Sequence, residues 1–379
     1  MKNHISNQCI FLISQQSWGE MFVSKHHYAV QLSKQNNQVF FLNPPDQQGI
    51  LSPGEIQIEK SPYDGLNIVH HRLFFPYKMK FHLPSLYVFV MRLYIKRMIQ
   101  KLNINPTIIW SFDLSDTIPL QAFPKAAKRI FMPVDRSYGA MTMRAAKAAD
   151  YLVVITAENE LAFSKLHKPL LKITHGVAPA FIHQPIPFQK NGKLQIGMSG
   201  NFTRPDIDWS TLIKIVEANK EVIFECWGSF RSKGSNLAGS EMDDPDMIQK
   251  SDYLASLPNF RIHGNIPSNQ LSKDLKNMDG FLICYDPRKD FTGGSNYHKI
   301  LEYLGTGKVI ISNRGESYRN TGLLEMAKEI DNADLPEKFK SVISNIESYN
   351  EMNLQIKRIE YAKNNTYKRQ LEKIATFIN

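Results

Sequence analysis

The sequence predicts an α/β protein made of two doubly wound, Rossmann-like domains, each with a parallel sheet. Short apolar runs of strand length alternate with helical patterns along the chain, and this alternation falls into two separate series. The chain has 379 residues, which is more than one ordinary hydrophobic core accommodates and is typical of two domains. Its hydrophobic fraction of 42% and charged fraction of 22% are those of a folded globular protein.

The first series begins with the apolar run CIFLIS. A loop, the helical run VSKHHYAVQLSK and the strand-like QVFFLNPP follow it, and together they form a βαβ unit. The runs TIIWSF, KRIFMPV and YLVVIT supply further strands, with the helical YGAMTMRAAKAAD between the last two. We therefore expect an N-terminal domain over residues 1–183.

The second series begins at LQIGMSGNF. It continues through the helical WSTLIKIVEANK, the strands VIFECWG and FRIHGNI, the helical SNQLSKDLKNM, the strand GFLICYD, a further helix and the strand KVIIS. Residues 181–193 separate the two series, because two prolines and a glycine there interrupt the periodicity as a linker does. We expect a C-terminal domain over residues 193–361 and a last amphipathic helix, about 362–379, that packs back on the N-terminal domain.

The formal charge of +10 is concentrated in the first half of the chain. Residues 1–183 contain 20 Lys and Arg against 11 Asp and Glu, a net +9, which indicates an anionic partner: a nucleic acid, a phospholipid surface or a phosphorylated substrate. Within this half, residues 78–102 carry six basic residues and apolar residues at helical spacing (Leu86, Val90, Leu93). This segment is either a core-facing helix with a solvated side or a helix that docks on an anionic bilayer.

The cysteines and the N-terminus bear on the cellular compartment. Cys9, Cys226 and Cys284 lie far apart and form no CxxC motif, so we expect free thiols in a reducing compartment. The apolar run near the N-terminus has only about six residues, fewer than a signal-peptide core or a membrane span needs. The sequence therefore predicts a cytoplasmic protein, which is peripheral on the inner face of the membrane if the basic helix docks there.

The stretch TGGSNYHKILEYLGTGKVIIS, residues 292–312, contains the most informative pattern in the chain. Gly293 and Gly294 give the backbone freedom, and Ser295 or Asn296 is a good N-cap for the helix that follows. The amide groups and the dipole at the start of such a helix favour a bound anion.

Glu302 lies inside this otherwise apolar helix. A carboxylate there is well suited to accept hydrogen bonds from the two hydroxyl groups of a ribose, roughly 9 Å from Asn296 along the helix axis. Lys299 lies three residues earlier, close to the phosphate end of a nucleotide placed in this way. The alternative is an ordinary amphipathic helix with a Glu–Lys pair.

Other nucleotide and metal motifs are absent or weak. No GxxxxGK[ST] follows a strand, and neither strand that begins a series is followed by GxGxxG, which disfavours a P-loop ATPase and a dinucleotide enzyme. The DID at 206–208 and the DPD at 244–246 match a DxD metal motif formally. Neither follows an obvious strand, so we expect both to face solvent and predict no metal site.

The helix that carries Lys299 and Glu302, together with the strand after it, resembles a segment of a known family. SNYHKILEYLGTGKVIIS resembles the asparagine–proline–x–lysine–x–x–glutamate–tyrosine–leucine–alanine–x–glycine–lysine segment of family 4 glycosyltransferases, which have the GT-B fold. The matching residues are Asn296, Lys299, Glu302, Tyr303, Leu304, Gly307 and Lys308. The opening SQQSWGEMFVSKHHYAVQLSKQNNQVFFLNPP resembles the teichuronic-acid-type branch, and further motifs in the same order extend the resemblance over nearly the whole chain.

The resemblance implies two Rossmann-like domains that face each other across a cleft and bind a nucleotide-diphosphate sugar. Glu302 would bind the donor ribose, and backbone groups around Gly264 and Asn265 would hold the base. The diphosphate would lie against Lys299 and the turn before its helix. The residues of that turn are Gly293, Gly294, Ser295, Asn296 and Tyr297.

The sequence departs from the family pattern at three positions. Tyr297 replaces the family proline, His175 replaces an asparagine, and Asn201 replaces the arginine that usually follows the first strand of the second domain. A departing diphosphate needs at least one cation to stabilise its charge. The candidates for that cation are Arg204, Arg288 and Lys289. We choose Arg204, for which the alternative is a solvated surface arginine.

Further candidates lie in the N-terminal domain. His26 and His27 stand at a predicted helix start, where one of them contacts the acceptor or the donor phosphate, or merely packs or caps the helix. Asp135 ends a strand, where ligands bind in open α/β sheets, and it matches an aspartate of the same branch. The catalytic candidates are thus Lys299, Arg204, Asp135 and His27.

The resemblance implies a glycosyltransferase that moves a sugar from a UDP- or GDP-linked donor to a glycan or lipid-linked acceptor in surface polysaccharide biosynthesis. In family 4 the anomeric configuration is retained. We expect no cofactor beyond the donor substrate, no metal and no nucleic-acid partner. The alternatives are a sugar-nucleotide epimerase on the same fold and a non-enzymatic basic protein that binds nucleic acid or membrane.

Overall fold

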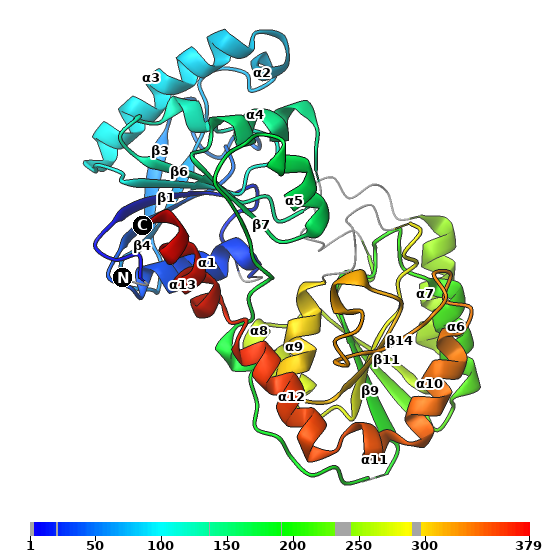
Figure 1. Cartoon of the computed structure of the whole chain (residues 1–379). Coiled ribbons are helices and arrows are strands. Elements are labelled where there is room, and N and C mark those ends of the chain that lie inside the picture. Colours follow the sequence, from blue (N-terminus) through cyan, green and yellow to red (C-terminus); the bar gives the residue numbers. More distant parts are fainter. Residues whose placement is uncertain (1–3, 20–21, 136, 191, 232–243, 290–296) are drawn as a thin grey trace. The chain divides into compact units, whose positions relative to one another are not determined.

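The computed structural model of the chain describes residues 4–19, 22–135, 137–190, 192–231, 244–289 and 297–379. It divides into two compact units: unit 1 is Met1–Thr174 with Tyr367–Asn379, and unit 2 is His175–Thr366. Each unit contains one sheet flanked by helices (Figure 1). The predicted α/β class with two parallel sheets is confirmed.

The sheet of unit 1 has eight described strands in the order β3-β4-β2-β1-β5-β6-β7-β8, and every neighbouring pair is parallel except β3 and β4. The described elements of unit 1 are β1 (Cys9–Ile13), α1 (Ser24–Ser33), β2 (Gln38–Leu42), β3 (Ile56–Lys60), β4 (Leu66–His71), α2 (Met79–His82), α3 (Pro84–Leu102), β5 (Ile108–Ser111), the 3-10 helix η1 (Leu120–Ala122), β6 (Lys128–Phe131), α4 (Ala140–Ala148), β7 (Tyr151–Val154), α5 (Ala157–Ser164), β8 (Leu170–Lys172) and α13 (Tyr367–Ile378).

This sheet is buried on both faces. Along β1, Ile10 and Leu12 join the apolar cluster that includes α1 and α13, whereas Phe11 and Ile13 join the cluster that includes α3. Because successive side chains of a strand alternate between the faces, a strand buried on both sides must be apolar throughout, as CIFLI is. Helix α3 therefore covers the sheet face opposite α1 and α13 (Figure 1).

The sheet of unit 2 has six described strands, all parallel, in the order β11-β10-β9-β12-β13-β14. Its described elements are η2 (Pro179–Phe181), β9 (Leu194–Ser199), α6 (Trp209–Ala218), β10 (Val222–Trp227), α7 (Pro245–Ser256), β11 (Phe260–Gly264), α8 (Ser268–Leu275), β12 (Gly280–Ile283), α9 (His298–Thr306), β13 (Val309–Ser312), η3 (Glu316–Tyr318), β14 (Glu325–Met326), α10 (Leu335–Ser344), α11 (Ile346–Tyr349) and α12 (Met352–Lys363).

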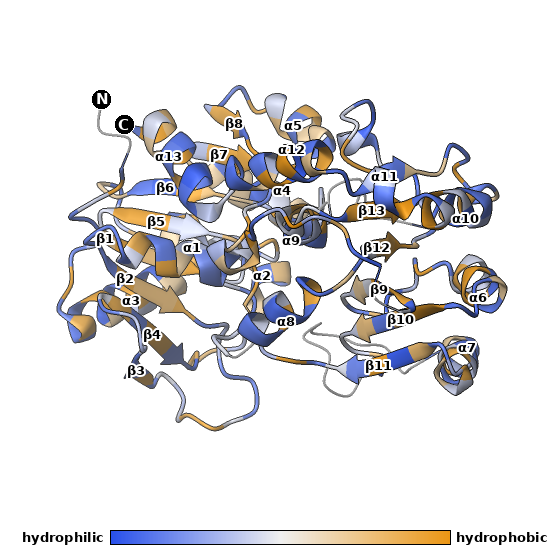
Figure 2. Ribbon diagram, turned by 90° about the horizontal axis from the view of Figure 1, so that it is seen from below, coloured by the Kyte–Doolittle hydropathy of each residue, from blue (hydrophilic) through white to orange (hydrophobic). Residues whose placement is uncertain are grey.

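The strand order of unit 2 reverses between β9 and β12, since the chain grows outward from β9 to β11 and then returns to β12 on the other side of β9. Apolar residues (orange) dominate β12 and β13, while α8 is largely hydrophilic (Figure 2). In open parallel sheets, ligands bind at the carboxyl ends of the strands beside such a reversal.

The unit boundaries differ from the predicted ones near residues 183–193 and 361. The chain passes from unit 1 to unit 2 between Thr174 and His175, and it returns between Thr366 and Tyr367. The last predicted helix begins at Tyr367, and it belongs to unit 1, where its first ring packs edge-on against Tyr28 of α1 at 5.2 Å.

The segment predicted as a linker is part of unit 2. The Val177 amide donates to the Asn365 carbonyl at 3.0 Å, within a parallel β-bridge at the end of unit 2. Further on, the Ile186 amide donates to Gln355 of α12 at 3.1 Å, and the Gln355 amide group donates back to the Ile186 carbonyl at 2.8 Å. These hydrogen bonds hold the proline-containing segment against α12, a contact that composition alone does not reveal.

Helix α9 is fixed to the sheet of unit 2 by Tyr303. The Tyr303 hydroxyl accepts a hydrogen bond from the Ser199 amide at 2.6 Å, and its ring stacks on Phe281 of β12 at 4.1 Å. Tyr303 is fully buried, so this contact anchors α9 at the ends of β9 and β12. The helix begins at His298 with Tyr297 as N-cap, not at the predicted Ser295 or Asn296, which lie outside the described residues.

Two further expectations concern the thiols and the membrane. Cys9, Cys226 and Cys284 are all unpaired, as predicted, with Cys226 and Cys284 buried and Cys9 half-buried. In the described part of the chain, no helix is both long enough and apolar enough to span a bilayer.

Candidate functional site

The carboxyl ends of β9 and β10 approach each other through two glycines. Gly200 has φ of +140° and Gly228 has φ of +135°, a region that residues with a side chain rarely adopt. A Cβ on Gly228 would overlap the carbonyl oxygen of Gly200, and a Cβ on Gly200 would overlap the amine of Lys299. The absence of a side chain at Gly200 therefore gives the Lys299 ammonium its position at the strand ends.

Tyr285 contacts both candidate cations of the site. The Lys299 ammonium donates a hydrogen bond to the Tyr285 hydroxyl and lies 4.8 Å from the centre of its ring. The Arg204 guanidinium lies 5.2 Å from the same ring and 5.8 Å from the ring of Tyr297. The two tyrosine rings stack at 4.5 Å. The two stacked rings thus hold both cations in place, Arg204 against both rings and Lys299 against Tyr285, since cations are attracted to the faces of aromatic rings.

Arg204 is not the solvated arginine of the alternative interpretation. Its Nε donates to Asp206 at 2.8 Å, and Asp206 is buried. Burial lowers the pKa of Arg204, but the hydrogen bond and the charge of Asp206 outweigh it and raise the pKa above its usual value. Arg204 is thus a permanent cation whose charge is already compensated by a carboxylate.

The other two candidates for the cation, Arg288 and Lys289, lie on the loop after β12. Arg288 Nε donates to Asp286 at 2.9 Å, and this hydrogen bonding lowers the pKa of the Asp286 carboxyl despite its burial. Lys289 is exposed, its backbone amide donates to the Asp286 carbonyl at 3.0 Å, and its charge also lowers the pKa of the Asp286 carboxyl. Among the described residues, no carboxylate pairs with Lys299. Within the described part of the chain, Lys299 is therefore a cation at the strand ends that no carboxylate compensates.

Glu302 lies on α9, three residues beyond Lys299. Its side chain is only 13% exposed. It has, however, a partner that the sequence interpretation missed: His298 Nδ1 lies 3.3 Å from Glu302 Oε1. His298 in turn packs edge-on against His175 at 5.7 Å. The signal was available, because residues four apart face each other on a helix.

The residues expected to hold a base lie at the end of β11. Gly264 has φ of +71°, and a Cβ built there would meet no described atom within 4 Å, so space is open beside its backbone. The Gly264 carbonyl accepts from the Gly228 amide at 2.8 Å, and the Asn265 side chain donates to Ser229 at 2.9 Å. The expected diphosphate-binding residues Gly293, Gly294, Ser295 and Asn296 lie outside the described residues.

The candidates of the N-terminal domain belong to unit 1. His27 stacks on Tyr367 of α13 at 4.6 Å, which corresponds to the packing role. Asp135 is exposed after β6, and its charge acts on Lys25, a buried lysine that the sequence interpretation missed. Burial lowers the pKa of Lys25, against the opposing effects of Asp135 and Asp113.

The two DxD-like segments have structural roles. Asp206 binds Arg204, and Asp208 caps α6 by accepting from the Thr211 amide at 3.0 Å. The expectation that both acidic residues of this segment face solvent is wrong for Asp206, which is 3% exposed. In the second segment, Asp246 pairs with Lys250 at 2.6 Å. The described residues contain no group of three or more His, Cys, Asp or Glu that could hold a metal.

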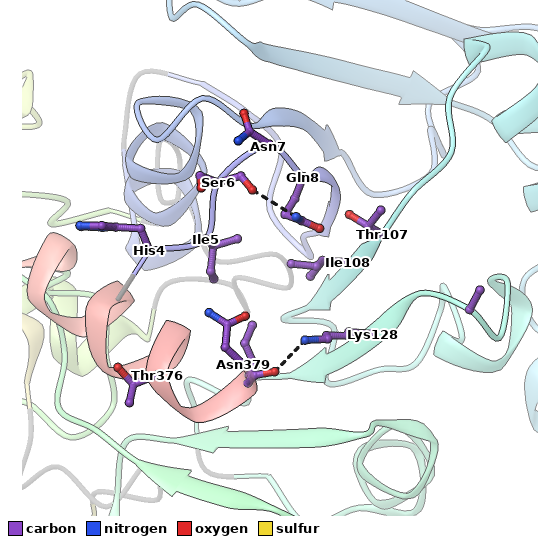
Figure 3. A pocket seen from close by; sticks show the side chains of 12 residues that line it. His4, Ile5, Ser6, Asn7, Gln8, Thr107, Ile108, Lys128, Thr376 and Asn379 are labelled. Atoms are coloured by element: carbon purple, nitrogen blue, oxygen red, sulfur yellow. Dashed lines mark hydrogen bonds between the residues drawn. The ribbon is translucent and has the colours of Figure 1, made fainter. Parts of the chain in front are cut away.

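A cavity of about 780 Å³ lies in unit 1, at the amino ends of strands (Figure 3), whereas Asp135 follows the carboxyl end of β6. It is lined by residues that precede or begin β1, β5 and β6 and by the end of α13, including Gln8, Thr107 and Lys128. Lys128 donates to the Ile378 carbonyl at 2.8 Å across its wall. No predicted site residue lines this cavity.

Comparison with known proteins identifies the fold. No family model matches the chain, and no curated protein matches its sequence. Three solved structures cover nearly all of it: an E. coli trehalose-6-phosphate synthase bound with UDP-2-fluoro glucose (TM-score 0.66, 8% identity, 97% of this chain and 98% of that one), Anabaena HepE in complex with UDP and glucose (0.67, 11%, 98% and 100%), and the lipopolysaccharide outer core galactosyltransferase WaaB (0.61, 14%, 98% and 99%). All have the GT-B fold, and this chain has it as well.

We predict that acid destabilises unit 1 through His26. This histidine is buried against Phe41, and burial lowers its pKa to about 4. Because that value lies below the usual 6.5, the unfolded chain takes up the proton first. The stability present above pH ~6.5 is lost as the pH falls through ~4, by about 3 kcal/mol.

Chemical denaturation at several pH values measures this loss. A His26→Gln variant should be less stable at neutral pH, but it should lose about 3 kcal/mol less than the wild type between pH ~6.5 and ~4. Other titrating groups, such as the similarly buried His71, are common to both proteins and cancel in the difference. Equal pH slopes for the two proteins would show that His26 is not buried in its neutral form.

Proposed function

We propose that this protein transfers a sugar from a nucleotide-diphosphate donor to a glycan or lipid-linked acceptor. The observation that carries the proposal is the Lys299 ammonium at the carboxyl end of β9, beside the reversal of strand order and three residues from Glu302. Parallel α/β sheets bind ligands at this edge. A cation that no described carboxylate compensates is suited to a phosphate there.

The shared fold supports the class of donor. HepE was solved with UDP and glucose, the E. coli enzyme with UDP-2-fluoro glucose, and WaaB is a galactosyltransferase. We extend to this chain a UDP- or GDP-linked sugar as donor. A retaining course and a role in surface polysaccharide biosynthesis, as in family 4 and its teichuronic-acid-type branch, belong to the same proposal.

Each part of the donor has a proposed partner in unit 2. The diphosphate binds Lys299, with Arg204 held beside it on the paired tyrosine rings. Glu302 accepts from the ribose hydroxyls through the carboxylate oxygen that His298 does not engage. The base lies in the open space beside the backbone of Gly264 and Asn265. The turn expected at the diphosphate consists of Gly293, Gly294, Ser295, Asn296 and Tyr297.

The reaction exchanges one bond at the anomeric carbon. The bond to the diphosphate oxygen breaks with its electron pair on the diphosphate, and the acceptor oxygen forms the new glycosidic bond. Lys299 stabilises the charge that develops on the leaving group. The acceptor proton leaves to a base, for which Asp135 of unit 1 is our candidate. We assign no step to His27, because its ring is occupied by Tyr367.

The proposal includes a location and an independence from metal. A lipid-linked acceptor lies at the inner face of the membrane, and we propose a peripheral contact there through residues 78–102. We propose no bound metal and no nucleic-acid partner.

Calorimetric titration with UDP, GDP and ADP in the presence of a chelator tests the proposed function. We expect UDP or GDP to bind, with an affinity that the chelator does not change. Absence of binding by all three nucleotides would overturn the proposal. If a nucleotide sugar is converted to its epimer without transfer, the epimerase alternative holds instead.

We predict that Glu302→Gln weakens nucleoside diphosphate binding about tenfold or more while the fold is retained. The change keeps the shape but removes charge-assisted hydrogen bonds, which contribute roughly 1.5–3 kcal/mol each. A 2′-deoxy nucleotide should bind the variant almost as well as the ribose form does, because both changes remove one interaction.

Glu360→Gln on the exposed side of α12 serves as the matched control and should bind as the wild type does. Normal binding by Glu302→Gln would rule out the ribose contact. Unfolding of the variant without ligand would instead show that the carboxylate is structural.

We predict that Tyr285→Phe weakens nucleoside diphosphate binding by about two- to fivefold, because Lys299 loses the hydroxyl that orders its flexible side chain. Tyr285→Leu should weaken binding further, because Arg204 also loses its aromatic contact. Calorimetry measures both, with Tyr349→Phe as a control whose hydroxyl has no described hydrogen bond. Tighter binding by Tyr285→Phe would show that the hydroxyl competes with phosphate for Lys299.

A further inference from the structure

A short stretch of unit 1 exposes an unusual number of large apolar side chains. Of the sixteen large hydrophobic residues exposed in the described chain, six lie within residues 74–93, including all three of the phenylalanines. The five that belong to α2, α3 and the junction between these helices are each about half exposed. They are Phe81, Leu83, Leu86, Phe89 and Leu93. Contiguous apolar exposure of this kind marks an interaction surface.

Helix α3 has two apolar faces, and only one of them is used in the core. The buried face consists of Tyr87, Met91, Tyr94, Ile95 and Met98, all within 1% of complete burial. Of the residues singled out from the sequence, Leu86 and Leu93 point away from it, since a helix turns about 100° per residue, whereas Val90 lies beside it and is half-buried. The core-facing alternative therefore holds for the buried face of α3 but not for Leu86 and Leu93, and the outer face is apolar without a partner among the described residues.

The outer face changes in character along the helix. Leu86, Phe89 and Leu93 lie toward its N-terminal end, and the exposed cations Arg92, Lys96 and Arg97 lie beside and after Leu93. No acidic residue occurs anywhere between residues 65 and 112, where seven Lys and Arg occur. The surface thus combines an apolar patch with a positive potential, and no acidic residue nearby in sequence reduces that potential.

We propose that the outer face of α2 and α3 docks on an anionic lipid bilayer. The half-exposed leucines and phenylalanines enter the boundary between the headgroups and the acyl chains, and the cations bind lipid phosphates beside them. Charge complementarity favours this occupant over a second copy of the chain, because two copies would bring the same cations together.

The buried face of α3 fixes which residues can enter the bilayer. Tyr87 donates to the Thr117 carbonyl at 2.7 Å, and Tyr94 donates to the Arg72 carbonyl at 3.1 Å, so the helix is held against rotation about its axis. It is also part of the folded core before any lipid binds, which removes the cost of folding on the membrane. The structure therefore assigns a preformed docking face.

The purpose of docking rests on the proposed function, because a lipid-linked acceptor is what brings a transferase to the membrane. Lipid binding itself does not rest on it, since the surface lies in unit 1 and the proposed nucleotide site lies in unit 2. The two proposals can fail separately. Glu302→Gln should bind vesicles as the wild type does, and changes on α3 should leave nucleotide binding unchanged.

Co-sedimentation of the full chain with vesicles tests the proposal. We expect binding to vesicles with about 30% phosphatidylglycerol in phosphatidylcholine and about tenfold or more weaker binding to phosphatidylcholine alone. Raising the salt to about 0.5 M should weaken binding to the anionic vesicles, because it screens the cations.

Two pairs of variants separate the apolar and the charged contributions. Leu86→Ser with Phe89→Ser should lower the partition coefficient about a hundredfold, from about tenfold for each side chain withdrawn from the bilayer. Arg92→Gln with Lys96→Gln should lower it about 25-fold, from about fivefold for each cation. All four side chains are exposed, so the thermal midpoint should not change.

Matched controls lie on the helices of unit 2. Met352→Ser with Ile356→Ser removes two apolar side chains of similar exposure from α12, and Lys340→Gln with Lys363→Gln removes the same charge. Both controls should bind vesicles within about twofold of the wild type. Equal losses in the α3 variants and their controls would overturn the proposal. The proposal would also be overturned if the wild type bound no vesicles and sedimented as a dimer that the Leu86→Ser, Phe89→Ser variant does not form.

Discussion

The position of the Lys299 ammonium beside Gly200 is the contact on which the candidate site depends. The amine occupies space that any side chain at Gly200 would fill, and Gly200 in turn lies against Gly228 with both backbones in a region that glycine favours. Helix α9, anchored through Tyr303, fixes the position of the Lys299 backbone, and the hydrogen bond to the Tyr285 hydroxyl fixes the position of the Lys299 amine. A cation is thereby ordered at the sheet edge before any ligand arrives.

The fold could be predicted because burial on both faces of a sheet leaves a direct trace in sequence. Runs such as CIFLI and the first three residues of VIIS must be apolar when helices cover both faces of the sheet. The helix that carries Lys299 and Glu302 was also predictable, since its apolar period and its two polar exceptions are local features. The pair Glu302 and His298 was within reach of the same reasoning but was missed.

Contacts between distant segments could not be predicted. The stacking of Tyr285 on Tyr297 joins two loops, and Arg204 of a third loop lies 5.2 Å from the Tyr285 ring. The attachment of Ile186 to Gln355 of α12 likewise follows from tertiary packing, so composition indicated a linker where unit 2 continues. For α3, periodicity identified a helix but could not distinguish its core face from its apolar outer face.

Hydrogen–deuterium exchange with and without a saturating nucleoside diphosphate tests the central claim most directly, because it locates the ligand as well as detecting it. Slower exchange is predicted at residues 200–204, 285–286 and 297–302, where the cations and Glu302 lie at the sheet edge of unit 2. No change is predicted at residues 4–8 and 376–379, which line the cavity of unit 1. Protection confined to that cavity, with none at residues 297–302, would contradict the account.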